Sequence, residues 1–204
     1  MSLQRNSMTR ILAINGSYRD NGTIDQVIDL VIQTAKESGT VVEEVKLRDF
    51  PIEFCRNCRQ CTQEPGEAPG HCVQQDRMPE LIDKIESADG YVFASPTNFY
   101  TVTAVFKRFM ERLVVYGYWP FGTAAPKPRR RPTGKPAVLV ASCAAPGLMG
   151  RVFYTTLKQL KLTTETIGAK SIGSLFVGLV SQQEQPVLSD RTRHKLRTLF
   201  NRLI

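Results

Sequence analysis

The chain has 204 residues, 42% of them hydrophobic, and a formal net charge of +8 at pH 7. The length suits one domain of ordinary size, and the hydrophobic content excludes a disordered chain. Since no apolar run approaches the roughly 18–20 residues of a membrane span, we expect no membrane partner, and the positive charge favours anionic partners.

The N-terminal segment, MSLQRNSM, is polar and lacks the apolar core of a signal peptide, so we expect a cytoplasmic protein. We treat residues 1–8 as disordered or partly as a remnant of expression. We therefore predict a single domain over residues 9–204.

The first strand and helix surround a polar loop. A short apolar run at 10–14 predicts a buried strand, and apolar residues with helical spacing begin at Ile24. Thr23 and Gln26 have the spacing of a capping box at the start of this helix, and Gly39 is expected to end it.

The remaining segments continue the alternation of strands with helices. We predict further strands at 40–47, 89–95, 137–142 and 172–180. We predict further helices at 78–88, 102–113, 151–164 and over the last segment, where the apolar positions are Leu196, Leu199, Phe200 and Leu203. The longer loops are expected at 48–76, 117–136 and 143–150.

This alternation is typical of an α/β fold with a parallel sheet covered on both faces. Five strand–helix units predict a doubly wound five-stranded parallel sheet of the flavodoxin-like order 2-1-3-4-5. Ligands in such folds bind at the carboxyl ends of the strands, near the switch in strand order. The loops at that edge are at 15–23, 95–101 and 142–150.

The first of these loops, NGSYRDNGT at 15–23, has the features of a phosphate site. It is neither a Walker motif, since no Lys precedes the Thr, nor a G-x-G-x-x-G turn. It offers Ser17, Arg19, Thr23, backbone amides and a helix N-terminus, which together suit one phosphate group. The alternative is a strand–helix turn that needs Gly only for its backbone.

The other two loops suit a flat heterocycle. In SPTNFYTV, Thr97, Asn98 and Phe99 offer backbone amides and an aromatic surface beside the sheet edge, although Phe99 and Tyr100 are equally compatible with core positions. The small residues at 142–147 let a planar ligand approach the backbone. The three loops together indicate a mononucleotide with a flat ring, a description that FMN satisfies.

Four of the five cysteines lie within 18 residues. Cys55, Cys58 and Cys61 are spaced C-x2-C-x2-C, and Cys72 follows after ten residues. Four thiolates at such spacing are able to hold a [4Fe–4S] cluster or zinc, or the set remains as reduced thiols. The nearby Arg56 and Arg59 would offset the charge of a tetrathiolate site, and also fit an exposed loop.

The sequence assigns no catalytic side chain. Cys143 is expected to be a small buried residue, because no histidine is placed to activate it. His71 and His194 are expected at the surface. In a flavoprotein the redox chemistry occurs on the flavin, so no catalytic side chain is needed.

These motifs resemble those of a known family. NGSYRDNGT resembles the G-S-x-R-x-x-G-x-T phosphate loop of the NAD(P)H-dependent FMN reductase family. ADGYVFASPTNFYTVTAVFKRFMERL resembles that family's second signature, a strand followed by S-P-x-x-x and a helix with a Phe-Lys or Leu-Lys pair. CRNCRQC…HCVQQDRM resembles the iron–sulfur flavoproteins and their cluster-free relatives, although the gap of ten residues is longer than in the cluster-binding pattern.

The resemblance implies a flavodoxin-like fold, bound FMN, and a homodimer or a dimer of dimers. It also implies which residues contact the flavin. The phosphate would be held by Ser17, Arg19, Gly22 and Thr23. The ring would be lined by Pro96, Thr97, Asn98, Phe99 and Tyr100. The site would be closed by Ser142, Ala144 and Gly147.

We therefore expect an oxidoreductase that passes electrons from NADH or NADPH through FMN to a quinone, a flavin or another small acceptor. One alternative is an electron carrier with FMN, and with or without a cluster, that lacks a nicotinamide site. Another is a nucleic-acid-binding module using the basic loop and the last helix, but no nucleic-acid motif is present, so we expect no nucleic-acid partner.

The long loop at 117–136 carries two further expectations. Tyr118, Trp119 and Phe121 are placed either to cover a flavin ring or to bury a subunit interface. The basic run at 129–131 is a candidate for attracting the phosphates of NADPH.

Overall fold

The computed structural model describes residues 8–182 and 186–204, so most of the N-terminal leader lies outside the described residues. Within them, five parallel strands form the central sheet in the order β2-β1-β3-β6-β7. Counted within this sheet, the order is 2-1-3-4-5, which confirms the predicted doubly wound, flavodoxin-like fold. The strands are β1 (Arg10–Asn15), β2 (Val41–Lys46), β3 (Gly90–Pro96), β6 (Pro136–Ser142) and β7 (Lys170–Val177).

The strand register brings the three predicted loops to one edge. Asn15, the last residue of β1, lies opposite Ala94 of β3, and Pro96 at the end of β3 lies opposite Ser142 at the end of β6. The chain therefore leaves β1, β3 and β6 at neighbouring points of the same sheet edge.

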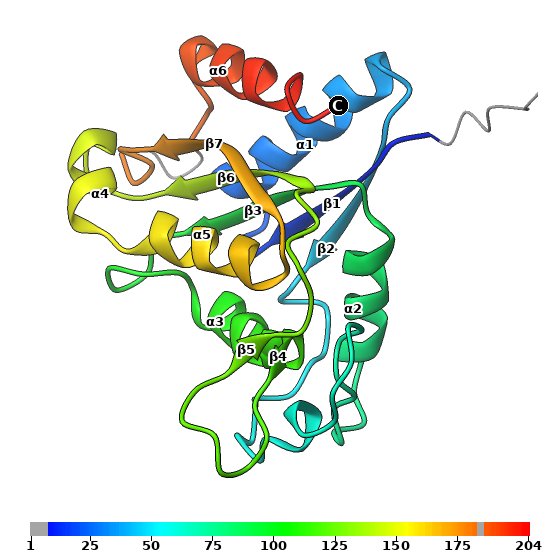
Figure 1. Cartoon of the computed structure of the whole chain (residues 1–204). Coiled ribbons are helices and arrows are strands. Elements are labelled where there is room, and N and C mark those ends of the chain that lie inside the picture. The colour runs from blue at the N-terminus through cyan, green and yellow to red at the C-terminus, as the bar shows by residue number, and fades with distance from the viewer. Residues whose placement is uncertain (1–7, 183–185) are drawn as a thin grey trace, which may run out of the picture.

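Helices cover both faces of the sheet (Figure 1). α1 (Thr23–Glu37) and α6 (Asp190–Phe200) lie on one face, and α2 (Met78–Ser87), α3 (Ala104–Arg112) and α5 (Thr156–Thr166) lie on the other. Side chains alternate along each strand, so Ile11 and Ala13 join the cluster under α1, while Leu12 and Ile14 join the cluster under α2 and α3.

The predicted capping box at the start of α1 is wrong. Gly22 is the N-cap, and no side chain among the described residues caps this end. Thr23 is already helical, and the Gln26 side chain instead donates to the carbonyl oxygens of Asn21 and Pro186. The predicted end of the helix is confirmed, because Gly39 has a φ of +71°, in the left-handed region that favours glycine.

Two other helices differ from their predicted bounds. α3 begins at Ala104 rather than 102, because the Thr103 hydroxyl caps it by accepting from the Phe106 amide. The helix predicted at 151–164 is two helices, α4 (Gly147–Phe153) and α5. The chain is extended at Tyr154, and the Thr155 amide donates to the carbonyl oxygen of Tyr100.

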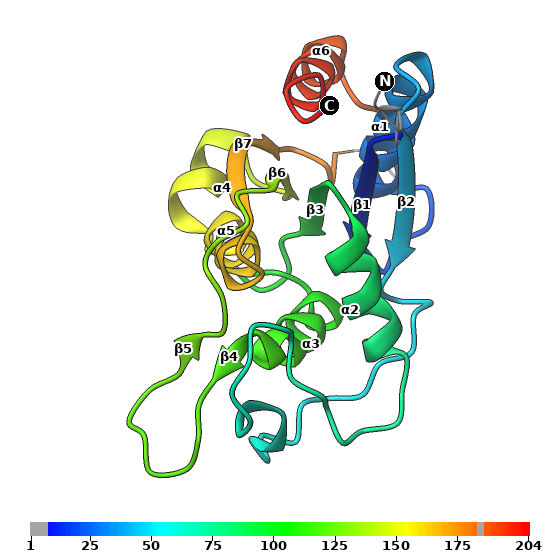
Figure 2. The ribbon, with the colours of Figure 1, turned by 45° about the vertical axis from the view of Figure 1, so that its right-hand side comes forward.

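The segment from 48 to 77 and the loop at 117–135 form a peripheral layer beneath α2 and α3 (Figure 2). The layer contains a turn of 3-10 helix, η1 (Gln60–Thr62), and a second such turn, η2 (Leu113–Tyr116), connects α3 to it. The loop predicted at 117–136 also holds a short antiparallel pair, β4 (Gly117–Tyr118) and β5 (Lys127–Pro128). None of the helices in the described residues has the length and apolar character needed to span a bilayer.

Candidate functional site

The loop between β1 and α1 is held from within by Asn15. This side chain is fully buried, and its Oδ1 accepts from the Ser17 amide at 2.9 Å. Its Nδ2 donates to Asp25 of α1 at 2.6 Å and to Glu44 of β2 at 2.8 Å. Asp25 also accepts from the Asn21 amide at 2.9 Å. The loop is thus tied to the strand before it, the helix after it and the neighbouring strand.

The loop after β3 makes a tight turn with an unusual backbone. Asn98 and Thr101 exchange both backbone hydrogen bonds, at 2.9 and 3.1 Å. The two residues between them, Phe99 and Tyr100, have φ values of 49° and 70°. Residues other than Gly and Asn are uncommon in this left-handed region of φ, and backbone strain of this kind is concentrated at functional sites. Phe99 is 98% exposed and Tyr100 is 65% exposed, so neither is a core residue.

The loop after β6 is anchored to the loop after β3 and to β7. The Thr97 amide donates to the carbonyl oxygen of Ser142 at 2.7 Å, and the Cys143 amide donates to that of Val177 at 2.9 Å. Burial raises the pKa of the Cys143 thiol, which donates to the carbonyl oxygen of Ala145. The raised pKa supports the expectation that Cys143 is a buried, unreactive residue.

The three loops enclose one groove of about 280 Å³ at the edge of the sheet. Its lining includes most of the residues predicted to contact the flavin, namely Ser17, Arg19, Gly22, Thr23, Pro96, Thr97, Asn98, Ser142 and Ala144. The N–H groups in the first turn of α1, which begins at this groove, have no acceptors within the helix. The groove thus combines hydrogen-bond donors suited to a phosphate at one loop with small residues and backbone at the other two.

Three of the predicted contact residues do not line the groove. Phe99 and Tyr100 project from their turn into solvent, where Tyr100 contacts Tyr154 edge to face at 5.2 Å. Gly147 lies in the first turn of α4 rather than in a loop.

Sequence reasoning missed four residues of the lining, Tyr18, Cys143, Val180 and Pro186. The first two lie between predicted residues in the same loops, so adjacency was the available signal. Val180 was predicted to be the last residue of the final strand, but β7 ends at Val177, so Val180 lies in the segment after the strand. Pro186 comes from the same segment, where the sequence carries no motif.

The four clustered cysteines line a separate, small cavity of about 20 Å³. Arg56, Arg59 and Arg112 line it as well. All four are free thiols, and as placed they do not form a metal-binding group. Within residues 8–182 and 186–204, no other set of three or more His, Cys, Asp or Glu side chains forms one either. Burial, followed by the neighbouring Cys72, Cys55 and Cys58, raises the pKa of Cys61 to about 11. The thiols are therefore close enough to influence one another's ionisation.

A buried ion pair supports this cavity. The Arg112 side chain is 1% exposed, and its guanidinium contacts both carboxylate oxygens of Asp76, one of them at 3.2 Å. It also donates to Cys72 Sγ at 3.5 Å and to the carbonyl oxygen of Glu53 at 2.8 Å. Burial raises the pKa of the Asp76 carboxyl, but the hydrogen bonds from Arg112 and from backbone amides outweigh it, so the pKa lies below its usual value.

Comparison with known proteins decides the family. The model of the family described as NADPH-dependent FMN reductase matches residues 9–182. The chain belongs to this FMN reductase family.

Curated relatives carry the name iron–sulfur flavoprotein. One from Archaeoglobus fulgidus is 34% identical over 111 residues, which are 54% of this chain and 48% of that protein. One from Clostridioides difficile is 32% identical over 108 residues, which are 50% of this chain and 44% of that protein. The chain spans about half the length of the curated relatives it matches.

Solved structures share the fold. An NAD(P)H:quinone oxidoreductase from Methanothermobacter marburgensis has a TM-score of 0.61 at 21% identity, covering 96% of this chain and 92% of that one. An FMN-dependent NADH-azoreductase from Bacillus anthracis, solved in complex with FMN, has a TM-score of 0.65 at 15% identity, covering 96% of this chain and 99% of that one.

Within one chain, the aromatic residues of the 117–136 loop contact the cysteine segment rather than the groove. The Arg59 guanidinium lies 3.8 Å from the centroid of the Trp119 ring and 5.0 Å from that of Phe121. It also donates to the carbonyl oxygens of Trp119 and Pro120. These contacts hold the loop against the segment that carries the thiols.

Two of the three arginines proposed to attract NADPH are already engaged. Arg129 donates to the carbonyl oxygens of Cys61, Glu64 and Val115 at 2.8–2.9 Å. Arg130 forms a two-pronged ion pair with Glu86 at 2.6 and 2.7 Å. Both therefore have a structural role in the peripheral layer.

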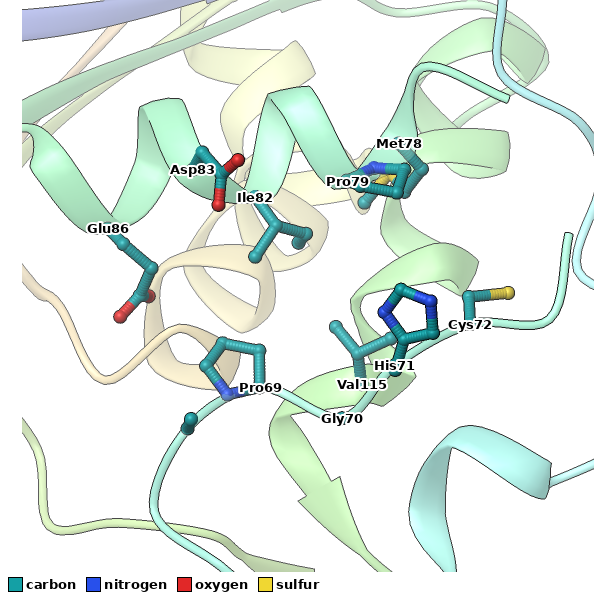
Figure 3. A pocket seen from close by; sticks show the side chains of 11 residues that line it. Pro69, Gly70, His71, Cys72, Met78, Pro79, Ile82, Asp83, Glu86 and Val115 are labelled. Carbon is teal, nitrogen blue, oxygen red and sulfur yellow. The ribbon is translucent and has the colours of Figure 1, made fainter. Parts of the chain in front are cut away.

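A second cavity, of about 350 Å³, lies between α2 and the loop at 68–72 (Figure 3). Figure 3 shows Pro69 and His71 on the loop facing Ile82 on the helix. Glu86 at one end of the cavity is paired with Arg130, and Lys135 donates to the Glu86 carbonyl oxygen. This cavity lies away from the carboxyl ends of the strands, where ligands of doubly wound folds bind, whereas the groove lies at those ends.

Proposed function

We propose that the chain is an FMN-dependent oxidoreductase that takes electrons from NADH or NADPH and passes them to a quinone, a flavin or another small acceptor. The observation that carries the proposal is the meeting of three loops in one groove at the switch point of the sheet. The chain belongs to the FMN reductase family, whose description names the same cofactor and electron donor.

The residues of the groove fit FMN in chemistry. Ser17, Arg19, Gly22, Thr23 and the first turn of α1 would bind the phosphate, because a helix N-terminus and hydroxyl groups stabilise a dianion. Small residues at 142–144 and the backbone at 96–98 would let the flat ring lie against the sheet edge.

FMN, when bound, supplies the transfer of hydride and single electrons. The chain's part is to hold the flavin, to orient it and to tune its charge. Of the three backbone amides from Thr97 to Phe99 expected to face the reduced ring, those of Thr97 and Asn98 already donate to the carbonyl oxygens of Ser142 and Thr101. The Phe99 amide would therefore be the one to stabilise negative charge on the reduced ring, as preorganised donors do in other active sites.

We propose that the outer part of the site is completed by a second copy of the chain, in a homodimer or a dimer of dimers. The groove is slightly smaller than the roughly 300–1,000 Å³ of pockets that enclose a whole ligand. Beside it, α4 leaves Leu148 78%, Val152 65% and Phe153 67% exposed, close in sequence to the predicted Gly147. An apolar surface of this kind next to a site is typical of an interface.

The interface is testable by light scattering after size-exclusion chromatography. Val152→Asp together with Phe153→Asp is expected to give monomers with weaker FMN binding. Leu162→Asp, which alters an exposed leucine on α5, is the matched control. A wild-type chain that is monomeric at all concentrations would contradict this part of the proposal.

We propose further that Cys55, Cys58, Cys61 and Cys72 hold a [4Fe–4S] cluster, as the name of the curated relatives suggests. The four thiols and three arginines around one cavity fit an anionic tetrathiolate site in chemistry. The cavity of about 20 Å³ is smaller than a cluster, so the four cysteine side chains would have to separate when one is assembled. Zinc, or thiols that remain free, are the alternatives.

Anaerobic purification distinguishes these outcomes. Iron and sulfide in equal amounts, with a broad visible shoulder beside the flavin bands, support the cluster. Zinc content, or four thiols that react with Ellman's reagent without metal release, contradicts it.

The second candidate function is an electron carrier without a nicotinamide site. It is favoured by the engagement of Arg129 and Arg130, which takes two of the three arginines expected to attract the phosphates of NADPH. Mixing the anaerobic holoprotein with NADH or NADPH separates the two functions. Bleaching of the flavin band supports the oxidoreductase, and its absence supports the carrier.

A further inference from the structure

We propose that Arg48 is a positioning residue that gives the groove its preference for a phosphorylated flavin over the same flavin without phosphate. The inference rests on the proposed FMN site. Arg48 does not line the groove, so it acts through the loop at 15–23 rather than by contact with the ligand.

Arg48 reaches this loop from the end of β2. The Leu47 amide donates to the carbonyl oxygen of Asn15 at 2.9 Å, which fixes the neighbouring Arg48 behind the loop. The Arg48 side chain is only 11% exposed. Its Nη1 donates to the carbonyl oxygens of Ser17, at 3.4 Å, and Arg19, at 3.0 Å.

These two contacts determine where the next amides point. A trans peptide unit is planar, so its C=O and N–H point in opposite directions. With the carbonyl oxygens of Ser17 and Arg19 directed at Arg48, the amides of Tyr18 and Asp20 point away from Arg48. Tyr18 lines the groove and Asp20 does not, so it is the Tyr18 amide that this geometry turns toward the groove. The hydrogen bonds of the described residues include no acceptor for either amide. The Tyr18 amide is therefore left for an anion in the groove.

Arg48 also offsets the acidic groups behind the loop. Its Nη2 pairs with Asp20 and lies 3.7 Å from Asp25, and its Nε lies 3.4 Å from Asp49. Asp25 is 5% exposed, so its charge is poorly screened by water. Without Arg48, these carboxylates would repel a phosphate dianion in the groove.

Both effects act on the phosphate and not on the ring. The ring side of the groove is formed by residues 96–98 and 142–144, which come from β3 and β6. Loss of Arg48 should therefore weaken FMN binding and leave riboflavin, which has the same ring and no phosphate, nearly unchanged.

The test is equilibrium binding of FMN and of riboflavin to the apoprotein, followed by flavin fluorescence. Arg48→Ala is expected to weaken FMN about 10- to 100-fold, the effect of losing charged hydrogen bonds, and riboflavin less than about threefold. Arg48→Gln retains donors to the carbonyl oxygens without the charge. Its affinity for FMN should therefore lie between those of the wild type and Arg48→Ala, and should depend less on salt than that of the wild type. Arg197→Ala, at an exposed arginine of α6, is the matched control.

The outcomes distinguish this inference from the proposed function. If Arg48→Ala leaves the ratio of FMN affinity to riboflavin affinity unchanged, whether both affinities stay the same or both fall equally, the inference alone is overturned. If Arg48→Ala does not fold, Arg48→Gln carries the same comparison. If the wild-type apoprotein binds neither flavin, the proposed function and the inference both fall.

Discussion

The buried pair of Arg112 and Asp76 allows a quantitative prediction. Asp76→Ala removes the acidic partner and leaves an uncompensated guanidinium whose side chain is 1% exposed. Breaking such a pair from one side costs about 3–5 kcal/mol, part of which is the loss of the hydrogen bond to the Met78 amide at the start of α2. For a chain of this size, at about 2–4 °C per kcal/mol, we expect Tm to fall by roughly 6–20 °C.

The pH dependence has a defined sign. Because the pKa of Asp76 is lower in the folded state than in the unfolded chain, its stabilising effect is present above the unfolded value of about 3.9. The effect is lost as the pH falls through the lower, folded pKa. Asp76→Ala should therefore destabilise the protein at neutral pH, and the difference from wild type should shrink in acid.

The assay is urea unfolding followed by circular dichroism at two pH values. Asp83→Asn, at an exposed carboxylate on α2, the helix that begins two residues after Asp76, is the control and should change stability by less than about 0.5 kcal/mol. The double variant Asp76→Ala with Arg112→Met should lose less than the sum of the single variants, because it removes both charges. A single variant as stable as the control, or additive losses, would refute the reasoning.

Three further predictions concern the groove and the reaction. Gly16→Ala would place a methyl group 2.7 Å from the Phe106 ring and 3.2 Å from the carbonyl oxygen of Ala94. Differential scanning fluorimetry should therefore show a loss of stability of about 1–3 kcal/mol. A variant as stable as the wild type would mean that the loop shifts to accommodate the methyl group. Phe99→Gly removes a side chain from a left-handed backbone and should raise the free energy of unfolding by roughly 1 kcal/mol. A lower free energy of unfolding would show that the Phe99 ring makes a stabilising contact. Steady-state kinetics with a nicotinamide and a quinone should give the parallel lines of a ping-pong cycle, and intersecting lines would contradict a single shared face of the flavin.

The amino-acid pattern alone determined the order of the sheet and the edge at which its three predicted loops meet. The spacing of apolar residues is a local property, and it was sufficient to predict the strands and most helices. Parallel topology then requires the loops after β1, β3 and β6 to meet at one edge. Ser17, Thr97 and Ser142 were predicted for this reason, and the structure brings them into one groove.

Tertiary structure decided what depends on contacts between distant residues. The capping box failed because Gln26 has an acceptor at Pro186, and the helix predicted at 151–164 is broken where Thr155 meets Tyr100. The pairing of Arg112 with Asp76 and the placement of Arg48 behind the phosphate loop have no signal in the local pattern. A side chain's partner is set by where the backbone brings other elements, and that placement becomes definite only when both faces of the sheet are packed.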